Sequence, residues 1–109
     1  MAAKIIIKRI VPKDKKTEIL PLIIQLRSQA AAQPGYVCGE SLVNADNLEE
    51  YIVISTWKDL DCWRDWLKSP QRSEIDTKIE AILGSKTEYG AYFYGDIYLH
   101  QSQTSSQFS

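Results

Sequence analysis

The chain has 109 residues, of which 44% are hydrophobic and 25% charged, and its formal net charge is −1. Such a chain forms one soluble domain with its own core, which excludes a collagen-like, disordered or disulfide-stapled protein. The balanced charge argues against a nucleic-acid binder. No apolar run is long enough for a membrane span or a signal peptide, so we expect a cytoplasmic protein without a membrane partner.

The first predicted strand covers residues 4–11 and is rich in isoleucine and valine. Ile5 and Ile7 fall on one of its faces, and Ile6 and Ile10 fall on the other. A strand with two apolar faces is covered on both sides. Because the helices of a small domain cover only one face of a sheet, the other face is expected to meet a second copy of the chain.

A helix is predicted next, running to about Gln33 and ending at Pro34-Gly35. Thr17 or Asp14 can cap its start, and we favour Thr17 because Pro21 then falls in the first turns, where proline is tolerated. One apolar stripe at helical spacing faces the core; it consists of Ile19, Leu22, Ile23, Leu26 and Ala30.

Two strands follow, over residues 36–43 and 51–57. Residues 44–47 between them have the composition of a turn, so the two strands are predicted to form an antiparallel hairpin. A long aromatic strand is predicted over residues 87–99. Residues 100–109 are rich in Gln, Ser and Thr and are expected to form a disordered tail.

Between the hairpin and the last strand, two short helices are predicted. Asp59 caps the first, Ser69 caps the second with Pro70 in its first position, and Gly84 ends it. The core stripe of the second helix consists of Ile75, Ile79, Ile82 and Leu83.

The order β-α-β-β-α-β predicts an α+β, ferredoxin-like domain over residues 1–99, with a four-stranded antiparallel sheet and helices on one face. The other sheet face is bare and apolar. A large bare apolar face is an interaction site, and a symmetric homodimer is the commonest way to cover it.

The chemistry available to the chain is mainly aromatic. It has a single histidine, His100, no cysteine–histidine cluster with metal spacing and no glycine-rich phosphate loop, so we expect neither a metal nor a cofactor. Trp57, Trp63 and Trp66 fall within ten residues. If they border a cavity between sheet and helix, that cavity suits a flat apolar ligand; otherwise they only fill the core.

The segment Tyr51 to Pro70, which reads YIVISTWKDLDCWRDWLKSP, resembles the antibiotic biosynthesis monooxygenase (ABM) domain family of the dimeric α/β-barrel superfamily. Pro34-Gly35-Tyr36 resembles the way the family enters its second strand. The resemblance covers about residues 4–99. It implies dimers of ferredoxin-like protomers whose sheets form a shared barrel. Some members oxidise aromatic compounds or quinols with O₂ and no bound cofactor, and others bind and cleave haem.

The resemblance also implies site residues. Trp66 occupies the position of a catalytic tryptophan in the haem-cleaving branch. That branch has an iron-ligating histidine where this chain has Asp76 and an asparagine where it has Lys8, which disfavours haem cleavage because a carboxylate replaces an imidazole poorly. We therefore predict Trp66 and Asp76 as catalytic residues, and a substrate-binding group of Lys8, Trp57, Trp63 and Tyr92.

Three hypotheses follow. The first is a cofactor-independent monooxygenase that acts with O₂ on a small aromatic or quinol-like molecule. The second is a non-catalytic dimeric domain that binds a flat hydrophobic ligand. The third is a haem-binding or haem-degrading protein. Each site residue also has a plain structural interpretation: Trp66 in the core, Asp76 on a solvated helix face and Lys8 at the surface.

Overall fold

The computed structural model describes residues 1–95 of the chain, so the tail and the end of the last predicted strand lie outside the described residues. A short 3₁₀ turn, Lys13–Lys15, precedes the first helix. The helices and strands are, in chain order, β1 (Ala3–Ile10), α1 (Lys16–Ala31), β2 (Tyr36–Asn44), β3 (Asn47–Trp57), α2 (Leu60–Lys68), α3 (Pro70–Leu83) and β4 (Glu88–Phe93).

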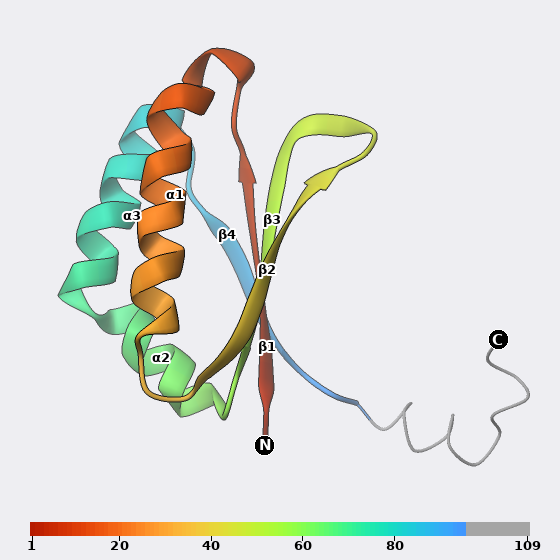
Figure 1. Cartoon of the computed structure of the whole chain (residues 1–109), viewed down its shortest axis with the longest axis vertical. Coiled ribbons are helices and arrows are strands. Elements are labelled where there is room, and N and C mark those ends of the chain that lie inside the picture. The colour runs from red at the N-terminus through yellow and green to blue at the C-terminus, as the bar shows by residue number, and fades with distance from the viewer. Residues whose placement is uncertain (96–109) are drawn as a thin grey trace, which may run out of the picture.

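The four strands form one antiparallel sheet in the order β2-β3-β1-β4. All three helices lie on one side of this sheet, as Figure 1 shows with the sheet nearly edge-on. This arrangement confirms the predicted α+β, ferredoxin-like architecture. Strand β1 is central, and its Ile7 pairs with Val53 on β3 and with Tyr89 on β4. The described helices include none long and apolar enough to cross a membrane.

The two faces of the sheet differ in burial because side chains alternate along each strand. On the helix side, Ile5 and Trp57 are fully buried and pack with α1 and α3. On the other side, which we call the open face, no described element covers β1. Ile6 and Ile10 of β1 are exposed there, with Leu42 of β2 on the same face.

Helix α1 begins earlier than predicted, and the Thr17 cap is wrong. The 3₁₀ turn, closed by a hydrogen bond from the Lys15 N–H to the Pro12 carbonyl at 2.9 Å, runs directly into the helix. Lys15 is already in a helical conformation and makes no side-chain capping bond. Pro21 consequently lies inside the helix, where it cannot donate to the Thr17 carbonyl.

The predicted start of α2 and both predicted ends of α3 are confirmed, whereas α1 ends at Ala31, before the predicted end at about Gln33. The Asp59 carboxylate accepts a hydrogen bond from the Cys62 N–H at 2.9 Å, and the Ser69 hydroxyl accepts one from the Arg72 N–H at 3.2 Å. Gly84 ends α3 in the left-handed conformation, with φ of 70°. These caps fix where α2 and α3 start relative to the sheet.

The bounds of β1 and β2 differ from the prediction by at most one residue, and those of β3 differ by more. Strand β3 begins at Asn47, four residues before the predicted start, because the hairpin turn is only two residues long. The Asn44 side-chain oxygen accepts a hydrogen bond from the Asp46 N–H at 2.8 Å, which closes that turn. Within the described residues, strand β4 runs to Phe93, and residues 96–99 of the strand predicted over 87–99 lie outside them.

Candidate functional site

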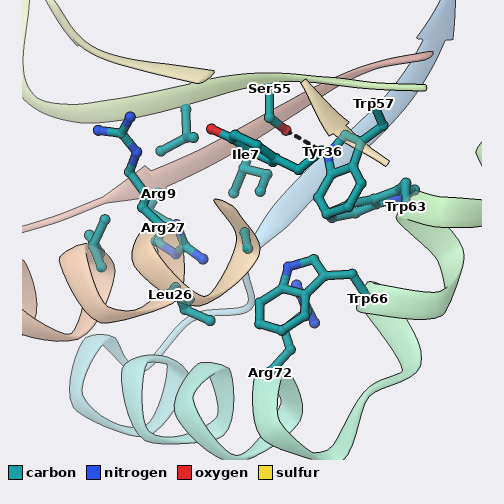
Figure 2. A pocket seen from close by; sticks show the side chains of 13 residues that line it. Ile7, Arg9, Leu26, Arg27, Tyr36, Ser55, Trp57, Trp63, Trp66 and Arg72 are labelled. Atoms are coloured by element: carbon teal, nitrogen blue, oxygen red, sulfur yellow. Dashed lines mark hydrogen bonds between the residues drawn. The ribbon is translucent and has the colours of Figure 1, made fainter. Parts of the chain in front are cut away.

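A cavity lies between the sheet and the helices, and Figure 2 shows Trp57, Trp63 and Trp66 grouped at one end of it. Its volume is about 40 Å³, measured as the space open to the centre of a water molecule. Strands β1 to β3 and all three helices contribute to its wall.

The local structure explains why the tryptophans meet. Trp57 is the last residue of β3 and lies on the same face as Val53 and Ser55, whereas Trp63 and Trp66 are three residues apart on one face of α2. The rings of Trp57 and Trp63 pack edge to face with centroids 5.9 Å apart. The indole N–H of Trp57 donates to the Ser55 hydroxyl at 3.1 Å, which satisfies a fully buried donor.

The ionic part of the site is a buried cluster of Arg9, Arg72 and Asp76. Arg9 donates from Nη2 to Asp76 Oδ1 at 3.3 Å, and Arg72 Nη2 lies 3.7 Å from Asp76 Oδ2. The Thr87 hydroxyl also donates to Asp76 Oδ1, at 2.9 Å. Both arginines line the cavity, whereas Asp76 lies behind them and does not.

The cluster is cationic overall, because two guanidinium groups share one carboxylate. Burial lowers the pKa of Arg9 below its ordinary value, and the neighbouring Asp76 opposes that shift only in part. The guanidinium of Arg72 lies over the rings of Trp63 and Tyr89, at 5.9 and 5.7 Å from their centroids. This cation–π contact orients Arg72 at the aromatic end of the cavity.

A third arginine, Arg27 of α1, also lines the cavity. Its Nη1 donates to the Ser41 hydroxyl at 2.9 Å, and its Nη2 donates to the Gly39 carbonyl at 3.4 Å. Within residues 1–95, the wall thus contains three arginines and no carboxylate side chain. The site combines an apolar, aromatic surface with a positive charge.

The structure brings together only part of the predicted site. Trp57, Trp63 and Trp66 line the cavity, and Asp76 supports its wall. Lys8 lies on the open face, where its ammonium is 3.3 Å from Glu50. Tyr92 also lies on the open face, since it pairs with Lys4 of β1. Side-chain alternation along β1 and β4 is the reason that neither of these two residues reaches the cavity.

Sequence reasoning missed Arg9 and Arg72, although the sequence contains a signal for each. Arg9 alternates in phase with Ile5 and Ile7, so it belongs to the helix-facing side of β1. Arg72 falls three residues before Ile75 on the buried stripe of α3. An arginine in phase with a core stripe is a buried cation.

Residues 1–95 contain no group of three histidine, cysteine or acidic side chains that could hold a metal ion. The arrangement can bind a flat ring against the indoles, exclude water from it and hold a negative charge beside it.

Comparison with known proteins establishes the family. The sequence model of the antibiotic biosynthesis monooxygenase family matches residues 2–77, which is more than half of the chain. The chain therefore belongs to the antibiotic biosynthesis monooxygenase family. No curated protein sequence matches it.

Several solved structures share the fold. A conserved protein from Methanosarcina mazei Go1 is 21% identical, with a TM-score of 0.79 over 87% of this chain and 94% of that one. A variant of SnoaB, a cofactor-independent oxygenase from Streptomyces nogalater, is 24% identical, with a TM-score of 0.75 over 85% of this chain and 92% of that one. Rv0793 from Mycobacterium tuberculosis is 12% identical, with a TM-score of 0.77 over 88% and 97%.

Proposed function

We propose that the protein is a monooxygenase that acts with O₂ on a small aromatic or quinol-like substrate, without a bound cofactor, in the tryptophan-lined cavity. The observation that carries this proposal is the cavity itself: three indoles at one end of a cavity between the sheet and the helices, in a member of this family. The likeness to SnoaB, a cofactor-independent oxygenase, supports it.

The reaction makes modest demands on the protein, because an electron-rich hydroxyarene supplies its own electrons. In the balanced reaction, the hydroxyl O–H and a ring C–H bond break, and the ring carbon gains one oxygen atom as a quinone carbonyl. The second oxygen atom leaves as water with the two hydrogens. The protein's part is to hold the ring flat, favour its ionised form and exclude bulk water.

In this proposal Trp66 contacts the substrate ring, and Trp57 and Trp63 complete the apolar surface. Asp76 is a positioning residue: it acts through Arg9 and Arg72, whose guanidinium groups it holds at the wall. Trp66 comes from α2, and the arginines come from β1 and α3. The ring of the substrate would therefore contact one part of the cavity wall, and the substrate oxygen would contact another.

Oxygen uptake by the metal-free protein tests the proposal, with a panel of quinols and hydroxylated aromatic compounds. We expect uptake above the rate of autoxidation and a loss of most of it in Trp66→Phe. Ile24→Ala, which changes an exposed apolar residue of α1 outside the cavity, serves as the control. Binding of aromatic compounds without any uptake would replace the proposal with the non-catalytic binding domain.

We also propose that a second copy of the chain covers the open face. Ile6, Leu42 and Tyr92 are 37%, 46% and 56% exposed on this face. Light scattering should give about twice 12.4 kDa, and Ile6→Lys should shift the protein toward the monomer because it buries a charge in the interface. Ile24→Lys makes the same change on α1 and should remain dimeric. A wild-type monomer would refute the proposed dimer.

A further inference from the structure

The cavity wall holds buried cations that the protein's own groups do not fully satisfy. Arg9 and Arg72 are only 5% and 6% exposed. Their single shared carboxylate is Asp76, so the cluster carries one unbalanced positive charge. The negative charge of Glu80 also acts on Arg9, although the Glu80 carboxylate itself lies 3.6 Å from the Lys86 ammonium and accepts a hydrogen bond from the Thr87 N–H.

Two nitrogen atoms of these arginines lack hydrogen-bond partners within the described part of the chain. They are Arg9 Nε and Arg72 Nη2, and both are fully buried. Arg72 Nη2 is 3.7 Å from the nearest Asp76 oxygen, which is an ion pair but too long for a hydrogen bond. A buried donor without a partner is costly, and a buried unpaired charge is more so.

The same two residues line the cavity, so an occupant lies next to their side chains. A guanidinium group presents a planar fork of N–H donors that matches a pair of carboxylate oxygens or a single ionised hydroxyl. Arg72 is further oriented by the rings of Trp63 and Tyr89. The cavity wall therefore combines two cationic side chains with the aromatic surface on which a ring would lie.

We propose that Arg9 and Arg72 form an oxyanion subsite, and that the ligand of this cavity is a planar aromatic anion whose carboxylate or ionised hydroxyl binds there. This inference names the substrate class and rests on the proposed function of the cavity as the substrate site. Asp76 then acts as the counter-charge that leaves the arginine pair with a single positive charge for the ligand.

The test compares probes that differ in charge but hardly in shape. Isothermal titration calorimetry measures the affinities of benzoate and of its neutral analogue benzamide for the wild-type protein. We expect benzoate to bind at least about tenfold more tightly than benzamide, because charge-assisted hydrogen bonds are stronger than neutral ones. The preference should persist at high salt, because a buried subsite is screened far less than exposed lysines are.

A second probe separates the two kinds of oxyanion. The ionised form of 4-nitrophenol absorbs visible light, so its absorbance at fixed pH reports how much of the bound compound is ionised. An increase in the ionised fraction on binding, without a preference for benzoate, assigns the subsite to an ionised hydroxyl. A preference for benzoate alone assigns it to a carboxylate. Either result supports the oxyanion subsite.

Variants locate the effect. Arg9→Gln and Arg72→Gln should each lower the affinity for benzoate about tenfold and leave that for benzamide nearly unchanged. Lys78→Gln removes an exposed cation from the same helix as Arg72 and should change neither affinity. If the arginine variants do not fold, the wild-type comparison of benzoate with benzamide still decides the question.

Equal affinities for benzoate and benzamide, with no change in the ionisation of 4-nitrophenol, would overturn the subsite, as would a failure of all three probes to bind. The proposed oxygenase fails separately. If the protein prefers benzoate but consumes no oxygen with any hydroxyarene, the oxyanion subsite is supported and the oxygenase activity is refuted. Oxygen uptake without any preference for anions would support the oxygenase and refute the oxyanion subsite.

Discussion

Arg9 on the central strand and Asp76 on the last helix are 67 residues apart in the chain, yet Arg9 Nη2 donates to Asp76 Oδ1 at 3.3 Å. This bond joins β1 to α3 inside the core. It also sets the position of one of the arginines at the cavity wall.

Removing the carboxylate from this cluster should be strongly destabilising. Asp76→Asn leaves Arg9 and Arg72 buried without a counter-charge, and we expect a loss of about 3 kcal/mol in the free energy of unfolding. Urea denaturation measures this loss. Asp65→Asn makes the same change on an exposed site of α2 and should cost less than about 0.5 kcal/mol. Equal losses in the two variants would mean that Asp76 does not balance the arginines.

The indole N–H of Trp57 has the Ser55 hydroxyl as its hydrogen-bond acceptor. Ser55→Ala removes the acceptor of its N–H and leaves a fully buried donor without a partner. We expect a loss of about 1–3 kcal/mol in thermal or urea unfolding. Thr56→Ala changes the adjacent residue, whose side chain lies on the open face, and should cost less than about 1 kcal/mol. The hydrogen bond is unimportant if the two variants unfold alike.

Alanine substitution at the two glycines with positive φ distinguishes the cost of backbone strain from the cost of side-chain crowding. Gly84, with φ of 70°, has open space where a Cβ would lie, so Gly84→Ala should cost only the left-handed backbone penalty of about 1 kcal/mol. Gly35, with φ of 84°, would place its Cβ against the side chain of Cys62. We therefore expect Gly35→Ala to lower the free energy of unfolding more than Gly84→Ala. A smaller loss at Gly35 would contradict the close packing of this loop on α2.

The cap of α2 should give the protein a distinct acid response. The hydrogen bond from the Cys62 N–H lowers the pKa of Asp59 below its ordinary value of 3.8. A carboxyl group with a lowered pKa in the folded state stabilises the fold above pH 3.8 and loses this contribution as the pH falls through the folded-state pKa.

Asp59→Asn keeps a good capping residue but does not titrate. Its melting temperature should therefore fall less steeply than that of the wild type below about pH 4, while the two curves run parallel near neutral pH. Thermal unfolding followed by circular dichroism across this range measures the difference. Parallel curves down to pH 2 would show that the charge of Asp59 contributes nothing to the cap.

The fold was largely predictable because its signals are local. Asp59, Ser69 and Gly84 mark helix ends through bonds to residues only three or four positions away. The start of α1 was missed because the backbone carbonyl of Pro12, and not a side chain, begins the helical turn. The early part of β3 was missed because three of its first four residues are polar and the fourth, Leu48, is exposed, so no apolar alternation marks them.

Only the aromatic part of the site was predictable from the sequence. The three tryptophans are close in sequence and meet at the cavity. The resemblance to the family points to Lys8, whereas alternation with Ile5 and Ile7 indicates the adjacent Arg9. The contact of Arg9 with Asp76 depends on how α3 packs on β1. No local pattern encodes that packing.

The positions of the tryptophans have a practical consequence. All three tryptophans of the chain line one cavity, so its intrinsic fluorescence arises where a ligand would bind. Tryptophan emission therefore reports ligand binding in the cavity sensitively, but it reports folding only at this one site. A shift in emission on adding an aromatic compound measures the local environment of the indoles, and only agreement with a backbone signal distinguishes ligand binding from the loss of the whole structure.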